Sequence, residues 1–456
     1  MRKGFLGTLA ALAAGAGLTF GQSYTPPPGP GGPADFGYYS PDGNPVIMPP
    51  GMEGMVPPGA MGRGPYGSGG GIFNSGNGGP PRIWFGADYL YWMPRSLDIQ
   101  YPLVTTSAPA DLGVLGAATT AALCGPNSDV GYSNVNGFRA WLGCAIGDGD
   151  RSGIEVGGFW LEKEHRTFSF ASNGAGSPVL AVPFVDLQTG VQGAYVVSAP
   201  GIANGSIIVG TEFHAWGVEA NCVFNLYRPG ADAGGLEFLV GARFFELEER
   251  LTLNTSSTAI TVPPIVSPSV FFPGGGGLFA GAPVAPGTIT TFDSIRTFNE
   301  FYGAQVGVRG EHGLGKFSIA FTGKVAAGMV REWVELDGAS ASTVGGTASV
   351  QPGGILNLAQ DLCKHRKDRF AWMPEGDINI ACYITPKCRI QAGYSFMWIS
   401  NVLRPTSVTT PVLAPSLIPT SPTFTGAPPG NVPPRDIVHD TDFFLHGFNV
   451  GVQISF

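Results

Sequence analysis

The feature that most constrains the fold is the order of the connections between segments in which apolar residues take every second position. A period of two is that of a β-strand with one apolar face and one polar face. The segments are residues 82–98, 133–146, 152–172, 208–227, 235–254, 289–310, 316–337, 369–385, 388–403 and 440–456. Short, turn-like connections (147–151, 228–234, 311–315 and 385–387) alternate strictly with long ones (about 99–132, 173–207, 255–288, 338–368 and 404–439). This alternation gathers every long connection at one end of an antiparallel sheet.

Connections of this length are uncommon in a compact soluble domain. Outer-membrane β-barrels, by contrast, join their strands by short periplasmic turns and long external loops. We therefore predict an all-β fold, a closed antiparallel transmembrane β-barrel of about ten strands, with about 12 strands as the alternative. Five long loops would lie outside the cell, and an even strand number would put both chain ends on the periplasmic side.

The charged residues of these segments fall on one side of the predicted strands. The other side is nearly uncharged over about ten residues, the length that a tilted strand needs to cross a bilayer. The charges are sparse and of both signs, as expected in a narrow lumen where each charge must find a partner. We predict a lumen-lining ion network of Arg139, Glu155, Glu219, Arg243, Arg309, Lys324, Asp377 and Arg389. Trp141, Phe245 and Tyr383 share this inward parity, whereas His214 and His446 fall on the apolar side.

The last strand has the same pattern and ends the chain on an aromatic residue. Its apolar residues are Phe448, Val450, Val452, Ile454 and Phe456, and Asn449 and Gln453 lie on the opposite side. A terminal aromatic of this kind resembles the signal by which barrel-assembly machinery recognises its substrates. We therefore predict that the five apolar residues form the assembly signal and that this machinery is a partner of the chain.

The N-terminal region is distinct from the predicted barrel, which we assign to residues 82–456. Residues 1–21 begin with Arg2 and Lys3, continue through an apolar run and end at small residues. This is the order of a secretory signal peptide. Residues 22–81 are rich in Pro and Gly, so they bury too little apolar surface to offset their ordering entropy, and we predict a disordered extension. A signal peptide followed by a barrel pattern predicts that the protein is exported to the bacterial outer membrane.

Composition and motifs exclude several other classes of protein. The net charge of −8 gives no electrostatic footprint for nucleic acid. The chain has no C-x-x-C pair, no P-loop and no G-x-S-x-G motif, and its six histidines are scattered. We therefore predict no metal, no cofactor and no enzyme, and a hydrolase with a Ser/His pair on the barrel wall is the remaining enzymatic alternative. Cys382 and Cys388 flank a predicted turn, which leaves a hairpin disulfide and buried thiols both open.

The predicted long loops contain one charge cluster, the basic run KHRKDR at Lys364–Arg369. Such a run attracts anionic headgroups or polysaccharide, or steers anions to a pore mouth. The alternative is a solvated loop end without a specific role.

Several motifs resemble those of a β-barrel porin family of bacterial outer membranes, the beta-barrel porin-7-like proteins. They include Trp84 followed by ADYLYW, and FDSIRTFNEFYGAQVG at residues 292–307. Further matches are GIEVGGFWL, WGVEANCVFNL, LVGARFFELEE, FAWMPEGDINI, AGYSFMWISNVLRP and DFFLHGFNVGVQISF, which follow one another along the chain. The resemblance extends from Trp84 to the C-terminus and implies an outer-membrane barrel.

We predict an outer-membrane porin that allows passive passage of small polar solutes, embedded in outer-membrane lipid. Its predicted size raises an alternative. About eight strands leave an interior that side chains fill, whereas open aqueous channels are typical at about 16 strands. The alternative is therefore a plugged structural or adhesive barrel that displays its loops.

Overall fold

The computed structural model describes residues 83–126, 128, 130–146, 151–227, 235–264, 266–274, 287–344, 347–362, 364–427 and 441–456. The chain divides into two units, Met1–Gly62 and Arg63–Phe456, and all described residues belong to the second. The predicted signal peptide 1–21 and extension 22–81 lie outside the described residues, as do the predicted turn 228–234 and most of the turn 147–151. No described helix is long and apolar enough to cross a membrane.

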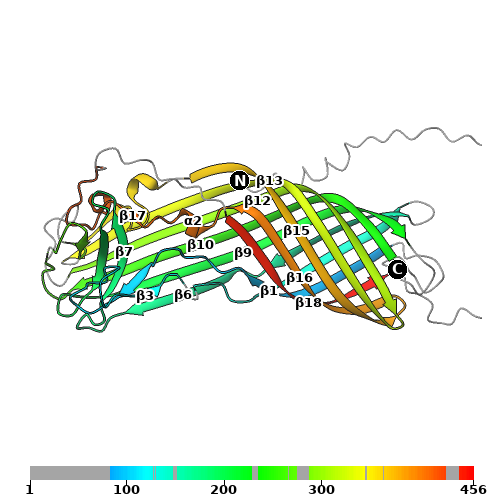
Figure 1. Ribbon diagram of the computed structural model, residues 1–456, viewed down its shortest axis with the longest axis horizontal. Helices are drawn as coiled ribbons and strands as arrows, with labels where there is room; N and C mark the ends of the chain where they lie inside the picture. Colours follow the sequence, from blue (N-terminus) through cyan, green and yellow to red (C-terminus); the bar gives the residue numbers. More distant parts are fainter. Residues whose placement is uncertain are drawn as a thin grey trace, which may run out of the picture. The chain divides into compact units, whose positions relative to one another are not determined.

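Ten strands form a continuous antiparallel ring, in which each strand pairs with the next along the chain and the last pairs with the first (Figure 1). They are β1 (Ile83–Pro94), β4 (Val135–Ile146), β5 (Ser152–Leu161), β9 (Ala203–Tyr227), β10 (Gly235–Ala259), β12 (Gly287–Leu314), β13 (Phe317–Val344), β15 (Lys364–Thr385), β16 (Cys388–Val402) and β18 (Thr441–Ser455). The prediction of an all-β fold with ten such strands is confirmed. One predicted strand, 152–172, is divided, because its second half forms a separate strand, β6 (Glu164–Ala171), which pairs with β9 beyond the ring.

Four neighbouring strands continue well past the ring. β9 and β10 have 25 residues each, and β12 and β13 have 28 each. Their distal halves form an open sheet, to which β6 adds beside β9 and β14 (Thr347–Pro352) adds beside β13. Most of this extension falls within the predicted strands, and of these four strands only residues 203–207, 255–259, 287–288 and 338–344 were predicted as loop and are strand. These short ends are rich in Thr, Ser and Gly and lack the apolar alternation of the ring, which explains the error.

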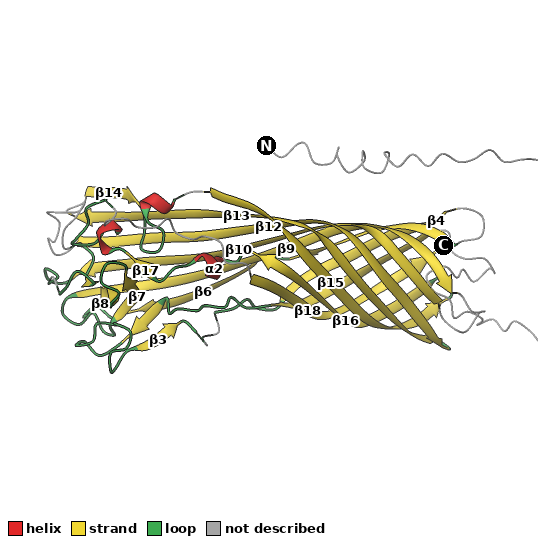
Figure 2. Cartoon of the chain, turned by 45° about the horizontal axis from the view of Figure 1, so that its top comes forward, coloured by secondary structure: helices red, strands yellow, loops and turns green. Residues whose placement is uncertain are grey.

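The remaining loop segments build a second sheet that covers this extension. Its strands are β2 (Val104–Thr106), β3 (Ala121–Cys124), β7 (Leu180–Asp186), β8 (Gln192–Ser198), β11 (Val270–Phe271) and β17 (Val412–Leu413). Short helices lie nearby in the chain: η2 (Ala359–Asp361), α2 (Pro405–Val408) and η3 (Pro415–Leu417). We call the extension and this second sheet together the head. It lies at the end of the ring opposite the C-terminus (Figure 2).

The two faces of the ring strands differ as the period of two predicts. On β13, the outward side chains from Phe317 to Met329 are uncharged, and Phe321 is 47% exposed. On the same strand Ser318 and Lys324 point inward and are buried. The outward faces of all ten strands together form a belt without Asp, Glu, Lys or Arg, which ends near the head at Phe244, Tyr302, Met329 and Phe370.

Two tryptophan side chains in the interior of the ring of strands pack directly against glycines. Trp84 on β1 is opposite Gly143 on β4, and Trp141 is opposite Gly86 on the same pair of strands. A Cβ added at Gly143 or at Gly86 would come within 2.1 Å of the facing indole ring. Trp84 is fully buried and donates from Nε1 to Glu155 at 2.8 Å. Trp84 therefore lies in the interior of the ring.

The substitution Gly143→Ala should therefore displace Trp84 and lower the free energy of unfolding by about 1–3 kcal/mol, the usual cost of overpacking. The measurement is urea unfolding in lipid vesicles followed by tryptophan fluorescence. Gly323→Ala is the matched control, because a Cβ at Gly323 meets nothing within 4 Å. Equal effects of the two substitutions would contradict the packing described here.

Candidate functional site

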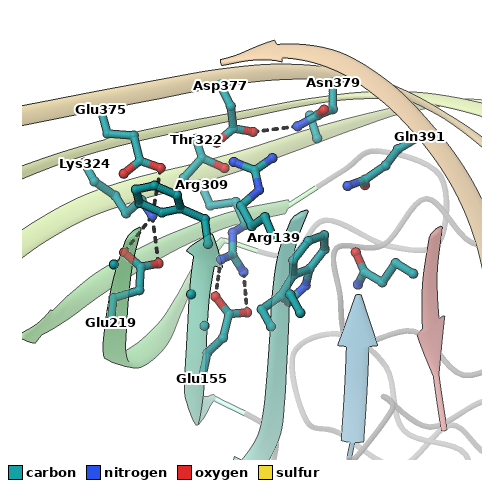
Figure 3. A pocket seen from close by; sticks show the side chains of 18 of the residues that line it. Arg139, Glu155, Glu219, Arg309, Thr322, Lys324, Glu375, Asp377, Asn379 and Gln391 are labelled. Carbon is teal, nitrogen blue, oxygen red and sulfur yellow. Dashed lines mark hydrogen bonds and ion pairs between the residues drawn. The ribbon is translucent and has the colours of Figure 1, made fainter. Parts of the chain in front are cut away.

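The interior of the ring holds a layer of charged side chains around a small cavity of about 100 Å³. All eight residues predicted to line a lumen border this cavity: Arg139, Glu155, Glu219, Arg243, Arg309, Lys324, Asp377 and Arg389. Figure 3 labels Arg139, Glu155, Glu219, Arg309, Lys324 and Asp377 among them. The eight residues come from β4, β5, β9, β10, β12, β13, β15 and β16, so that separate strands of the ring each contribute one charge. We call these residues and their ion-pair partners the charged layer.

Lys324 lies between two carboxylates. Its Nζ is 2.8 Å from Oε1 of Glu219 and 3.4 Å from Oε1 of Glu375. Arg243 contacts the same two carboxylates, directly at Glu375 and at 3.7 Å from Glu219. Gln305 donates from Nε2 to Glu219 at 3.1 Å. Two cations thus share two buried carboxylates, and each buried charge is balanced by a charge of opposite sign.

Arg309 makes the most complete ion pair of the charged layer. Its Nη2 is 2.5 Å from Oε1 of Glu155, and its Nη1 is 3.1 Å from Oε2 of the same carboxylate. This two-point geometry is the strong form of an Arg–carboxylate contact. Nη1 is also 3.4 Å from Glu237. Because Trp84 donates to Glu155 as well, this carboxylate has partners on both sides.

Two further pairs complete the charged layer. Arg139 donates from Nη2 to Asp88 at 2.6 Å, and Gln391 donates to the other oxygen of Asp88 at 2.8 Å. Arg389 donates from Nη1 to Glu311 at 2.7 Å and from Nη2 to Gln453 at 2.8 Å. The hydrogen bonds of Asp88 and Gln453 connect β1, β4, β16 and β18, so this network crosses the junction between the first and last strands.

Four carboxylates of the charged layer are missing from the predicted network: Asp88, Glu237, Glu311 and Glu375. Glu237 and Glu375 lie on the same predicted side as Arg243 and Asp377, so the pattern does give their inward direction. Asp88 lies in the aromatic stretch of the first strand, where no other charged residue indicates the inward side. Glu311 was predicted to lie in a turn, whereas β12 continues to Leu314 and the turn lies at Gly315 and Lys316. Strict alternation from Arg309 would have identified Glu311.

A layer of apolar side chains follows the charged layer on the side of the head. Each of the ten strands contributes a buried residue to it: Leu90 and Trp92, Val135, Phe159, Ala215, Phe245, Phe301, Ala326, Met373, Met397 and Leu445. The ring centroids of Trp92 and Phe159 are 5.4 Å apart, and those of Phe159 and Phe245 are 6.2 Å apart. These residues belong to one apolar core with the inner side of the head, including Val104, Phe184 and Tyr195. We call them the apolar layer.

Within the head, a buried ion pair joins the segment before α2 to the extension. Arg404 is 2% exposed, and its Nη2 is 2.6 Å from Oε1 of Glu249 on β10. Arg404 also donates to the carbonyl oxygens of Arg95 and Ser96, both at 3.0 Å. Tyr132 donates to Glu249 at 2.9 Å. Burial alone would lower the pKa of Arg404, but the Glu249 carboxylate outweighs it and holds that pKa above its usual value. Burial and Glu249 together raise the pKa of Tyr132, so this hydroxyl keeps its proton and stays a donor.

Among the residues that the structure describes, no group of three His, Cys, Asp or Glu side chains has a geometry that would hold a metal ion. Cys382 and Cys388 are free thiols, and Cys363 lies outside the described residues. His446 on the apolar side contacts the Tyr394 hydroxyl at 2.5 Å, and His214 packs edge-on against Trp160 at 6.0 Å. Both histidines thus lie among aromatic side chains of the outer face.

Comparison with known proteins identifies the family. The family model described as "Putative beta barrel porin-7" matches residues 84–271 and 278–456, whereas no curated protein sequence matches significantly. The crystal structure of the outer membrane protease OmpT from Escherichia coli is similar at 9% identity and a TM-score of 0.39, over 82% of this chain and 97% of that one. A Pseudomonas aeruginosa FadL homologue is similar at 7% identity and a TM-score of 0.20, over 82% and 90% of the two chains. These two likenesses are too weak to bear on function. The family match, in contrast, covers most of the chain, which therefore belongs to the beta barrel porin-7 family.

Proposed function

We propose that the ring is a closed β-barrel that spans the bacterial outer membrane and carries the head on the outer side. The uncharged belt supports this. The outward residues of β13 run from Phe317 to Met329, which is about 40 Å along a strand and about 30 Å across a bilayer at the tilt of such barrels. That length matches the hydrocarbon core of a membrane. Outer-membrane lipid is then the first partner of the protein.

We propose further that the barrel displays the head and does not conduct solutes at rest. The observation that carries this proposal is the apolar layer, to which every strand of the ring contributes a buried side chain. A polar solute that entered the charged layer would meet this layer and then the apolar core of the head. Desolvating a polar group there without a hydrogen bond costs several kcal/mol. Conductance of the purified protein in a planar bilayer is the test.

Passive passage of small polar solutes is the second candidate function. The cavity in the charged layer favours it, because residues of both signs line that cavity and suit water and polar solutes. The family is also described as a porin. Passage would require the apolar layer to part. The prediction that the protein is no enzyme stays a prediction.

A charge placed on the belt should oppose insertion. Ile380 on β15 is 59% exposed on the outward face, so Ile380→Arg should destabilise the inserted protein by about 2–4 kcal/mol, the cost of an arginine near the membrane centre. Unfolding in lipid vesicles measures the change. Val350 in the head is 66% exposed, and Val350→Arg should change stability by less than about 0.5 kcal/mol. A tolerated charge at Ile380 would count against lipid contact there.

Loss of the terminal aromatic should impair assembly. Phe456 is 62% exposed, and Phe448 and Val450 are exposed on the same face of β18. The side chain makes few contacts, and the backbone of Phe456 makes two hydrogen bonds with Ile83 at the strand end. Deleting Phe456 should therefore lower stability by no more than about 1–2 kcal/mol, while reducing the amount of inserted protein in cells several-fold. Quantitative blotting of outer-membrane fractions against total synthesised protein separates these effects. Val350→Ala serves as a control, and equal insertion of both variants would exclude Phe456 from the assembly signal.

A further inference from the structure

The basic run Lys364–Arg369 forms an exposed strand edge and not part of a loop as predicted. It is the beginning of β15 and pairs with β13 from Glu335 to Val330. The ladder between β15 and β16 starts only at Glu375, so the other edge of the run is not covered by β16. Residues 364–368 are all exposed. Four cations and one carboxylate give the run a charge of +3 with neutral histidine, in a chain whose net charge is −8.

The run lies just beyond the apolar belt on the side of the head. Phe370 and Trp372 continue β15 into the belt and are 49% and 51% exposed. Arg366 shares their outward parity and is about 13 Å along the strand from Phe370. On the neighbouring strand Arg331 is the next outward residue after Met329. In the proposed membrane orientation, the backbone of Arg366 lies about 10 Å beyond Phe370 along the membrane normal. The lipid headgroups extend about 5–8 Å beyond the hydrocarbon on each side, and long Arg and Lys side chains reach back to them.

The outward side chains of this region surround a pocket of about 370 Å³ on the outer face of β13 and β15. It is lined by Glu300, Arg331, Trp333, Glu335, Lys364, His365 and Arg366. The side chains of Arg331, Lys364 and Arg366 are 41%, 74% and 57% exposed. Among the described residues, the carboxylate partners of the two guanidinium groups are distant, at 3.6 and 3.9 Å for Arg331 and at 4.0 Å for Arg366. Lys364, by contrast, is paired closely with Glu335. The planar donor groups of the two arginines are therefore available to a phosphate, which they suit in geometry and charge.

We propose that this pocket binds the phosphate of an anionic lipid headgroup in the outer leaflet. The inference rests on the proposed function, because it needs the belt to lie in lipid. A lipid is favoured over free phosphate because Phe370 and Trp372 offer an apolar surface to acyl chains directly beside the cations. Exposed charges also protect strand edges from pairing with another chain, and the experiment separates that role from lipid binding.

The test uses the full-length protein in a neutral detergent and counts bound lipid by native mass spectrometry. Phosphatidylglycerol is the anionic probe, and phosphatidylcholine is its zwitterionic counterpart. The variant R331Q/K364Q/R366Q should bind phosphatidylglycerol about 100-fold more weakly at low salt, because each cation removed lowers the affinity by about fivefold. Binding of phosphatidylcholine should stay within about twofold of the original value. Inorganic phosphate in large excess should not displace the lipid.

The matched control removes three other cations on the outer face beyond the belt. Lys163, Arg250 and Arg296 pair there with Glu212 and Glu248, and K163Q/R250Q/R296Q should lose less than about threefold in affinity. Equal loss in both variants would overturn the proposal, as would displacement of the lipid by inorganic phosphate. Unchanged lipid affinity together with self-association of R331Q/K364Q/R366Q would assign the charges to edge protection. Failure to insert into vesicles would instead refute the membrane orientation, and it is measured separately from binding in detergent.

Discussion

Replacing Arg309 with methionine should lower the free energy of unfolding by about 3–5 kcal/mol, the usual cost of breaking a buried ion pair. The Arg309 side chain is 18% exposed and Glu155 is 3% exposed. Removing the guanidinium leaves Glu155 buried with Trp84 as its remaining donor, and it removes the contact of Glu237 at 3.4 Å. The measurement is chemical unfolding in lipid vesicles.

Two controls distinguish this ion pair from the general effect of losing an arginine. Arg331→Met should cost at most about 1 kcal/mol, because Arg331 is 41% exposed and its carboxylate partners are distant. The double variant Arg309→Met/Glu155→Met should recover much of the loss, since an apolar pair avoids the buried lone charge. A double variant as unstable as the sum of its parts would contradict the assigned partnership.

Arg404→Met should loosen the head while leaving the ring intact. The substitution leaves the Glu249 carboxylate, which is fully buried, and frees the carbonyl oxygens of Arg95 and Ser96. We expect about 3–5 kcal/mol less protection against opening of the head. The readout is hydrogen exchange of residues 97–126 and 404–427, which should become faster by about two orders of magnitude or more. Exchange in the belt region of β16 and β18 should not change.

The neighbouring Arg95 is the control for Arg404. It pairs with Asp442 at 2.7 Å, and both side chains are 44% exposed, so Arg95→Met should change exchange in the head by less than about tenfold. If Arg404→Met accelerated hydrogen exchange in the ring as strongly as in the head, the ion pair would not stabilise the head alone.

Alternation in the sequence was sufficient to predict the ring. A period of two fixes which side chains share a face, so Arg139, Glu155 and Lys324 could be assigned inward without any contact being known. It could not give their partners, because Arg309 and Glu155 are 154 residues apart in sequence and only the closing of the ring brings β5 and β12 near one another.

The head could not be predicted for a related reason. Its strands pair across segments such as Val412 with Val185, which lie far apart in the chain. These segments are short and carry few charges, so local pattern gives no signal of their pairing. Lys364–Arg369 was predicted to lie in a loop for the same reason. The run has no alternation of apolar and polar residues, so its pairing with β13 leaves no local pattern in the sequence.

In our proposal the protein is a membrane barrel whose interior is sealed at rest by the apolar layer. Single-channel recording in a planar bilayer tests it most directly, with heat-modifiable mobility and protease protection showing that the protein has folded and inserted. We expect no conductance steps above the lipid background, and we expect steps to appear in a variant that opens the apolar layer, F159A/F245A/F301A. Stable conductance steps of the unaltered protein would contradict a sealed interior and would favour passive passage of small polar solutes.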